Sequence, residues 1–308
     1  MRFTLRQLEI FVAIAQSGSA SRAAERLALS QSATSTALAE LERAYSQVLF
    51  DRVGKTLRLN DTGQWLLGRA TELLDRAQEL EDTLSTQSAV GPLRLGASLT
   101  IGNYLATLFV ADFLKRHPAS RVQLAVHNST DIVAAVARFE LDLGLVEGEV
   151  QHPDVVAEPW LHDELVVFAA PDHPLAAKAR VSRAEVLACD WILREPGSGT
   201  RATLDHAFGS ERQQLRVRLE LEHTEAIKRA VEAGLGLGCI SRLALRDAFR
   251  RGSLVPLPVQ GLDLGRAFYL VRHQNKYVTG GLATLIEHIR AFTGDATSTD
   301  DIALAPVA

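Results

Sequence analysis

The chain has 308 residues, of which 47% are hydrophobic, and a formal net charge of −4, so roughly two or three folded domains are expected. This charge excludes a uniformly basic nucleic-acid binder, but the charges are unevenly placed. Residues 1–60 carry eight Lys and Arg against five Asp and Glu, whereas the rest of the chain carries 25 against 32. A basic N-terminal module on an acidic body indicates phosphate contact at one end.

Cysteine usage and hydropathy exclude several classes of protein. Cys189 and Cys239 stand in apolar contexts without CxxC spacing, so two reduced thiols are expected rather than a disulfide framework or a zinc site. The sequence predicts no metal and no cofactor. The N-terminus lacks the apolar core of a signal peptide, and no apolar run is long enough to span a membrane. A cytoplasmic protein without a membrane partner is therefore expected.

Residues 17–58 are the most informative stretch, because they combine short helices, a tight turn and a hairpin. Before them, an apolar stripe from Leu5 to Ala15 predicts a first helix that ends at Ser17-Gly18-Ser19. A second helix is predicted at about 20–27, and Ser30 is a good N-cap for a third. The pattern is typical of a winged helix-turn-helix, which can place one helix in the major groove of DNA.

The third helix divides into two faces, and a predicted hairpin wing follows it around Gly54-Lys55. The face expected to pack inward carries Ala33, Ala37, Leu38 and Leu41. The outer face is polar: a Gln can read an adenine edge, and hydroxyls can donate to phosphates. A helix-turn-helix used only for packing stays open as an alternative. The candidate DNA contacts are Ser19, Ser21, Arg22, Ser30, Gln31, Ser32, Ser35, Thr36, Arg52, Lys55 and Arg58.

A long linker helix is predicted from its N-cap, Asn60, to about residue 88. Its apolar residues recur at spacings of 4, 3, 4, 3 and 4, which forms a seam suited to a partner helix. The predicted dimerisation residues are Leu66, Ala70, Leu73, Ala77, Leu80 and Leu84. The alanines favour a close approach of two helices, with an antiparallel pair as one arrangement. Packing of the seam on the protein's own body is the alternative.

From about residue 93, short apolar strands alternate with helical segments, which predicts an α/β body with largely parallel strands. Strands are expected at about 93–97, 122–126, 143–146, 165–170, 191–193, 216–221, 236–240 and 268–271. One sheet and two lobes both fit this pattern. The small, acidic tail from residue 294 is predicted to be disordered.

These motifs together resemble the LysR-type transcriptional regulators, over nearly the whole chain. The resemblance starts with LRQLEIFVAIAQSGSASRAAERLALSQSATSTALAELE and LFDRVGKTLRLNDTG. ASLTIGNYL, HNSTDIV, WILREPGSGTR and HTEAIKRAVEAGLGLGCISR look most like the YeiE/CysL-like branch, which is related to regulators of sulfur assimilation. One departure is Thr36 and Ala39, where the family often has Arg. With fewer cations, each DNA-binding domain is expected to bind phosphates more weakly.

The resemblance implies an N-terminal winged helix-turn-helix, a dimerising linker helix and a two-lobed α/β effector domain of the type II periplasmic-binding-protein fold. The parts would be residues 1–59, the linker helix 60–88, lobe I at 89–165 with 268–293, lobe II at 166–267 and the tail 294–308. It also implies a homotetramer built as a dimer of dimers. Promoter DNA and a small anionic effector are the expected partners, and RNA polymerase is a further candidate.

Several strand-to-helix joints of the body carry hydroxyls and glycines that suit an anion, because helix N-termini offer unpaired N–H groups. For each joint, capping of its own helix is the alternative. The candidate effector contacts are Ser98, Leu99, Thr100, Ile101, Asn128, Ser129, Glu147, Ser198, Gly199, Thr200 and Thr224. Glu147 repels an anion unless the ligand brings a proton or an amino group. The branch resemblance indicates sulfite, sulfate or a small sulfur metabolite.

Two other classes of protein fit parts of the sequence. An enzyme would need a catalytic motif, but Gly197-Ser198-Gly199 is not a nucleophile elbow, and the chain has no P-loop, no H-E-x-x-H and no complete G-x-G-x-x-G. A solute-binding protein fits the lobes but not the DNA-reading head. The function expected is a DNA-binding transcriptional regulator that senses a small anion and is not an enzyme.

Overall fold

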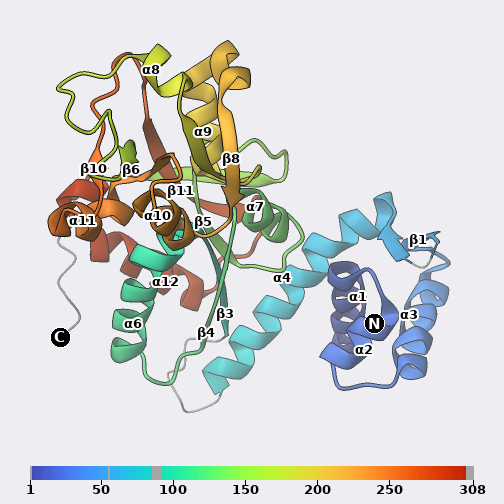
Figure 1. Ribbon diagram of the computed structural model, residues 1–308. Helices are drawn as coiled ribbons and strands as arrows, with labels where there is room; N and C mark the ends of the chain where they lie inside the picture. The colour runs from blue at the N-terminus through green and yellow to red at the C-terminus, as the bar shows by residue number, and fades with distance from the viewer. Residues whose placement is uncertain (1, 55, 85–91, 303–308) are drawn as a thin grey trace.

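The computed structural model describes residues 2–54, 56–84 and 92–302 and shows a small helical head, a long helix and a larger α/β body (Figure 1). The long helix, α4 (Asp61–Leu84), connects the other two parts. No helix in these ranges combines the length and the hydropathy needed to cross a membrane.

The head contains three helices and a hairpin, as the sequence predicts. They are α1 (Leu5–Ser17), α2 (Ala20–Arg26), α3 (Gln31–Tyr45), β1 (Phe50–Val53) and β2 (Thr56–Leu59). Ser30 caps α3 by accepting the Ala33 N–H at 3.1 Å. The expectation that Ala33 faces the core is wrong. Ala33 is exposed, and the next residue, Thr34, is buried with its hydroxyl donating to the Ser30 carbonyl at 3.1 Å.

The linker helix begins where Asn60 accepts the Gly63 N–H at 2.9 Å, which confirms the predicted cap. It ends at Leu84 in the described chain, and the last four residues of the predicted helix, 85–88, lie outside the described residues. One face of α4 packs on the head, where Leu67 and Ala70 are buried with α1. The other end of α4 lies beside the body.

The body is built on one nine-stranded sheet with the order β4-β3-β5-β11-β6-β9-β7-β8, and β10 pairs with β6. The pairs among β3, β4 and β5 are parallel, as are those of β7 with β8 and β9. The strands are β3 (Leu93–Ser98), β4 (Val122–His127), β5 (Leu143–Glu147), β6 (Val155–Ala169), β7 (Asp190–Arg194), β8 (Arg216–Leu221), β9 (Leu237–Ser241), β10 (Val255–Pro256) and β11 (Gly265–His273).

The helices pack on both faces of this sheet. They are α5 (Leu99–Ile101), the π-helix η1 (Gly102–Ala106), α6 (Thr107–Arg116), α7 (Ser129–Ala137), α8 (Arg183–Leu187), α9 (Gly199–Phe208), η2 (Gly209–Gln214), α10 (Thr224–Glu232), α11 (Arg242–Arg251), α12 (Gly280–Thr293) and η3 (Thr299–Asp301). Buried side chains form separate clusters, around Phe109 and Phe268 in one half and around Trp191 in the other. The body therefore has two lobes.

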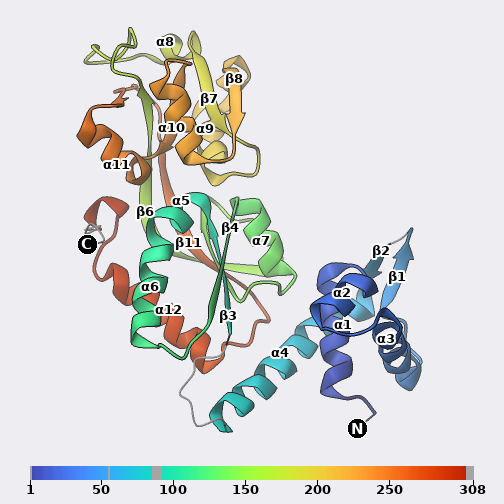
Figure 2. The same ribbon diagram turned by 60° about the horizontal axis from the view of Figure 1, so that its bottom comes forward.

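The long strand β6 continues from one lobe into the other, with β11 antiparallel beside its first half (Figure 2). Lobe I holds β3, β4, β5 and β11, and lobe II holds β7, β8 and β9. The sequence predicted only residues 165–170 of β6. Its first ten residues were missed because charged residues and Pro159 interrupt the apolar pattern.

The prediction of a disordered tail from residue 294 is wrong as far as the structure describes it. Thr299 is 1% exposed, and Ile302 belongs to the core of lobe I. The Thr299 hydroxyl donates to the buried carboxylate of Asp163 at 2.9 Å, and Arg246 donates to the Ile302 carbonyl at 2.9 Å. The small and acidic residues of this segment gave no indication in the sequence that Thr299 and Ile302 are held in place. Residues 303–308 lie outside the described chain.

Candidate functional site

Helix α3 lies on the side of the head away from the body (Figures 1 and 2). Gln31, Ser35 and Thr36 are exposed, as are Ser30 and Ser32, whose hydroxyls lie 3.0 Å apart. Ser19 and Ser30 already cap their helices, whereas no hydrogen bond within the described chain uses the side chains of Gln31, Ser35 or Thr36. The outer face of α3 is therefore free to meet a polar partner.

The head also carries exposed cations outside α3. Arg22, Arg52 and Arg58 are exposed, and within the described part of the chain none of them forms an ion pair, while Ser21 beside Arg22 is half-buried. The wing is fixed to the α1–α2 turn because the Leu57 N–H donates to the Gly18 carbonyl at 3.0 Å. Lys55 lies outside the described residues. An exposed polar helix face and unpaired arginines on the same small domain are suited to contact with the bases and phosphates of a DNA duplex.

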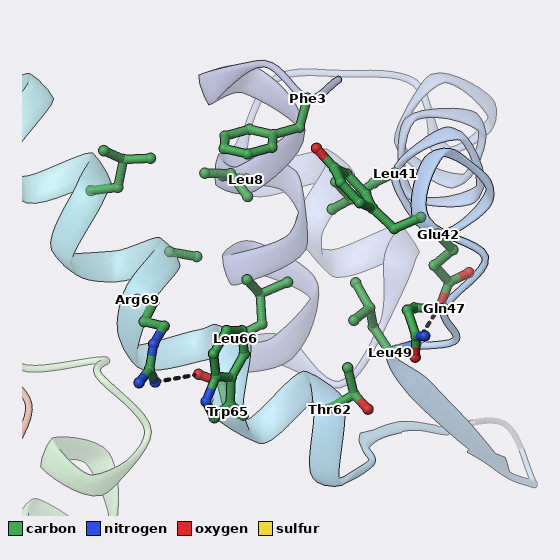
Figure 3. A pocket seen from close by; sticks show the side chains of 13 residues that line it. Phe3, Leu8, Leu41, Glu42, Gln47, Leu49, Thr62, Trp65, Leu66 and Arg69 are labelled. Atoms are coloured by element: carbon green, nitrogen blue, oxygen red, sulfur yellow. Dashed lines mark hydrogen bonds between the residues drawn. The ribbon is translucent and has the colours of Figure 1, made fainter. Parts of the chain in front are cut away.

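The seam of α4 is buried at its start and exposed at its end. Leu66 and Ala70 line a mainly apolar pocket of about 400 Å³ between α4 and the head (Figure 3). Phe3, Leu8, Tyr45 and Trp65 line it too. Further along, Leu73, Leu80 and Leu84 are 38%, 62% and 76% exposed. The packing alternative therefore applies to the first turns only, and an apolar surface is left on the rest of α4.

In the body, the predicted effector residues meet at the carboxylate of Glu147, which ends β5. The side chain of Glu147 is 1% exposed. Ser98 donates to Oε2 at 2.7 Å, and Thr100 donates to Oε1 at 3.1 Å. Ser129 donates to the backbone carbonyl of Glu147 at 3.2 Å. The capping alternative is therefore wrong for Ser98, whose hydroxyl makes no cap bond and serves the carboxylate instead.

Two charged residues that the sequence analysis missed complete this site. Arg266 on β11 is buried and donates from Nη1 to Thr200 at 3.0 Å and from Nε to Asp163 at 2.8 Å. Its Nη1 lies 3.7 Å from Glu147 Oε1. Asp163 on β6 accepts further hydroxyls from Ser241 at 2.7 Å and from Thr299. Arg266 and Asp163 could have been predicted from the sequence, because each is a charged residue within an otherwise apolar strand.

At two other strand-to-helix joints, the predicted effector residues cap their own helices. Asn128 and Ser198 cap α7 and α9 by accepting the N–H groups of Asp131 and Arg201, at 2.9 and 3.4 Å. Gly199 has no room for a side chain, since a Cβ there would lie 2.1 Å from the Glu147 carbonyl oxygen. The two lobes are thus in contact at this joint.

Three more candidate residues are buried. The side chain of Ile101 lies in the core of lobe I. Leu99 is 7% exposed. Thr224 is 2% exposed at the first turn of α10.

Further polar groups lie beside α10 of lobe II. Tyr104 of lobe I donates to Glu225 at 2.8 Å, and burial raises the pKa of Tyr104. Lys228 lies 2.5 Å from the same carboxylate. Arg194 pairs with Glu195 at 2.8 Å with its side chain 1% exposed, and its Nη1 has no hydrogen-bond partner in the described chain. Within the described residues, no group of His, Cys, Asp and Glu is arranged to hold a metal ion.

Comparisons with known proteins agree with this architecture. Residues 5–64 match the bacterial regulatory helix-turn-helix model of the lysR family, and residues 86–294 match the LysR substrate binding domain. A relative in Escherichia coli K12, the uncharacterized HTH-type transcriptional regulator YeiE, is 41% identical over 94% of this chain and 97% of its own. The RuBisCO operon transcriptional regulator of Allochromatium vinosum is 33% identical over 94% of this chain and 96% of its own.

Solved structures show the same fold. The Synechocystis CcmR regulatory domain in complex with 2-PG aligns with a TM-score of 0.62 and 31% identity, over 67% of this chain and 98% of that one. A full-length OxyR variant from Pseudomonas aeruginosa aligns with a TM-score of 0.69 and 23% identity, over 94% of this chain and 95% of that one. A winged helix-turn-helix joined by a helix to a two-lobed body defines a ligand-responsive transcriptional regulator. The chain belongs to the LysR family, and it is a DNA-binding regulator with an effector-binding domain.

Proposed function

We propose that the buried polar cluster at Glu147, where the two lobes meet, is the effector site of this regulator and that it senses a small oxyanion, with sulfite and sulfate as the first candidates. The observation that carries the proposal is the convergence of three buried hydroxyls, those of Ser98, Thr100 and Thr200, with Arg266 around one carboxylate. A group of donors this dense is suited to an oxygen-rich anion. Sulfite and sulfate come first because the sequence resembles a branch that is related to regulators of sulfur assimilation.

Glu147 limits the protonation state of the effector. Its carboxylate already accepts the hydroxyls of Ser98 and Thr100, so an anion that approaches must either displace it or donate a hydrogen bond to it. A singly protonated oxyanion can donate to Glu147 and accept from Arg266 at the same time. A fully ionised one, such as sulfate at neutral pH, cannot donate to Glu147 and would have to displace its carboxylate, so sulfite is favoured over sulfate.

The effector would act by population shift, since a ligand can change an equilibrium only through different affinities for the two states. Lobe contacts such as that of Gly199 with Glu147 differ between open and closed lobes. A ligand bound there would favour one lobe arrangement, and the spacing of the DNA heads in the assembly would follow.

Ligand binding by the full chain tests the proposal. We expect sulfite or sulfate to raise the melting temperature of wild type and to change its affinity for DNA that flanks its own gene, with a much smaller response in Thr100→Ala. If only 2-PG, the ligand in the CcmR structure, gives a response, the proposed effector changes from a sulfur oxyanion to 2-PG. No response to any of the three anions, or an equal response in Thr100→Ala, would overturn the effector site.

At the DNA end, we propose that Gln31 reads a base edge at the start of α3. Ser32, Ser35 and Thr36 would assist it, and Arg22, Arg52 and Arg58 would bind phosphates. All of these side chains are exposed, and those other than Ser32 have no partner within the described chain, which supports the assignment. An imperfect inverted repeat is the expected target, because paired heads compensate for the few cations of each. We place the protein in the cytoplasm with the promoter, and RNA polymerase is a proposed partner there.

We also propose that two copies pair through the seam of α4, as antiparallel helices. The seam is symmetric about residue 75, since Leu66 would face Leu84, Ala70 would face Leu80 and Leu73 would face Ala77. Two of these pairs join a large side chain to a small one, which permits close packing. The partner's Leu80 and Leu84 would then reach the pocket at Leu66 and Ala70. A tetramer would follow by pairing of two such dimers.

The oligomeric state tests this pairing. Leu80→Glu should yield monomers in sedimentation at concentrations where wild type is a dimer or tetramer. Leu5→Glu, which changes an exposed leucine outside the seam, is the matched control and should not alter the assembly. An unchanged assembly in Leu80→Glu would rule the seam out.

A further inference from the structure

Away from the proposed effector site, α4 is held on lobe I by a partly buried cluster of charges. Lys276 Nζ lies 2.5 Å from Asp75 Oδ2 on α4 and 2.8 Å from Asp142 Oδ1 on lobe I, and its side chain is 3% exposed. Arg94 of β3 lies 2.7 Å from the same Asp142 oxygen. We call Asp75, Arg94, Asp142 and Lys276 the linker clamp.

Neighbouring contacts extend this clamp along α4 and into the head. Glu79, one turn after Asp75, accepts the Tyr277 hydroxyl at 3.1 Å and the Gly280 N–H at 2.7 Å. On the head side, Gln16 donates to the Phe139 carbonyl at 2.7 Å, and the Phe139 ring packs into the head's own core. Asp75 and Glu79 lie on the face of α4 opposite the apolar seam, so that the clamp and a partner helix can be engaged together.

The clamp and the effector cleft lie at opposite ends of the same three adjacent strands. β3 carries Arg94 near one end and Ser98 at the other. β5 runs from just after Asp142 to Glu147, and β11 runs from Arg266 toward Lys276, three residues beyond its end. Along β3 and β5, four or five residues at about 3.3 Å each separate the two sites by roughly 13–17 Å. A strand paired on both sides moves as a rigid unit, so a shift at one end reaches the other.

The charges of the clamp are arranged so that α4 can separate from lobe I without leaving a buried charge unpaired. If α4 moves away, Lys276 still has its ion pair with Asp142 on lobe I, and Asp142 still has its ion pair with Arg94. Asp75 then returns to water, where its charge is solvated. Burial raises the pKa of Asp75 above its usual range, although Lys276 partly opposes the shift, so docking carries a desolvation cost that undocking relieves.

We propose that the linker clamp is a releasable contact that transmits the state of the effector cleft to the DNA-binding heads. Movement of Ser98, Glu147 and Arg266 on ligand binding would shift the far ends of their strands and thereby strengthen or release the hold on α4. This part rests on the proposed effector site, whereas the docking of α4 does not.

Asp75→Asn tests the clamp in the full chain, because it removes one charge from the docked face of α4. Glu81→Gln is the matched control, since Glu81 is an exposed acid of the same helix outside the clamp. In hydrogen–deuterium exchange, Asp75→Asn should accelerate exchange of the segment 276–280 roughly fivefold, and Glu81→Gln should not. Lys276→Gln should reproduce the effect if its melting transition stays cooperative. Equal exchange in the two α4 variants would overturn the docking role.

Transmission has a separate readout. With sulfite as the probe, Asp75→Asn should bind the anion in calorimetry with unchanged affinity but lose most of the sulfite-induced change in DNA affinity. A full change in DNA affinity in this variant would overturn transmission through the clamp. If sulfite binds neither wild type nor variant, the proposed effector fails, and transmission is then tested with sulfate and with 2-PG in the same design. The exchange experiment decides the docking role in either case.

Discussion

The head and the proposed effector site at Glu147 both present clusters of hydroxyl and charged side chains, but the hydrogen-bonding groups of the two clusters are satisfied in opposite ways. On α3, Gln31 and Ser35 are exposed without a partner in the described chain, and the nearby arginines are unpaired there. In the cleft, Ser98, Thr100 and Arg266 are buried and hydrogen-bond to carboxylates of the same chain. The polar groups of the head are thus available to a partner from outside. A ligand at the Glu147 cluster must instead compete with hydrogen-bond partners from the same chain.

This difference separates binding from stability. Loss of an exposed polar side chain removes a contact that forms only in the complex, so the isolated protein hardly changes. Loss of a buried member of a network leaves its former partner unsatisfied, and the folded protein bears the cost. The same type of substitution should therefore have different effects at the two sites.

The largest effect is expected for Arg266→Met. This change leaves the carboxylate of Asp163, 0% exposed, and that of Glu147 without their shared cation, and breaking a buried ion pair costs about 3–5 kcal/mol. Urea unfolding of the full chain measures the loss. Arg58→Met on the wing is the matched control and should stay within about 0.5 kcal/mol of wild type. Similar free energies of unfolding for the two variants would contradict the comparison.

A smaller effect is expected for serine substitutions at the two sites. Ser98→Ala removes a 2.7 Å hydrogen bond to a buried carboxylate, which should cost about 1.5–3 kcal/mol of stability, since hydrogen bonds to charged groups are the stronger ones. Ser35→Ala removes an exposed hydroxyl from α3 and should leave the unfolding free energy unchanged. The same urea titration checks both. A stability loss in Ser35→Ala as large as that in Ser98→Ala would show that α3 is not free.

The head could be predicted from the sequence because its signals are local. The N-cap at Ser30 and the hairpin at Gly54 depend on residues a few positions apart. Ala33 was misplaced because a one-residue offset on a helix turns a side chain by about 100°, and a stripe of small residues does not fix that rotation.

The cleft could be predicted only in part, because its partners come from distant strands. Ser98, Thr100 and Glu147 stand near strand ends, where their pattern was visible. Arg266 and Asp163 belong to strands that meet only after folding, 103 residues apart. The tail was missed for the same reason, since Thr299 is held by Asp163, 136 residues earlier.

The smallest effects separate two roles within the head itself. Gln31→Ala should lower discrimination between the operator and a mutated operator by about 1–3 kcal/mol, because it removes a base contact, while leaving nonspecific binding unchanged. Arg52→Ala should weaken binding to both DNAs about equally and reduce the slope of log affinity against log salt by about 1, because it removes a phosphate contact. Competition gel shifts over a salt series measure both quantities. Equal loss on both DNAs in Gln31→Ala would mean that Gln31 contacts the backbone, and the reading residue would then have to be sought among Ser32, Ser35 and Thr36.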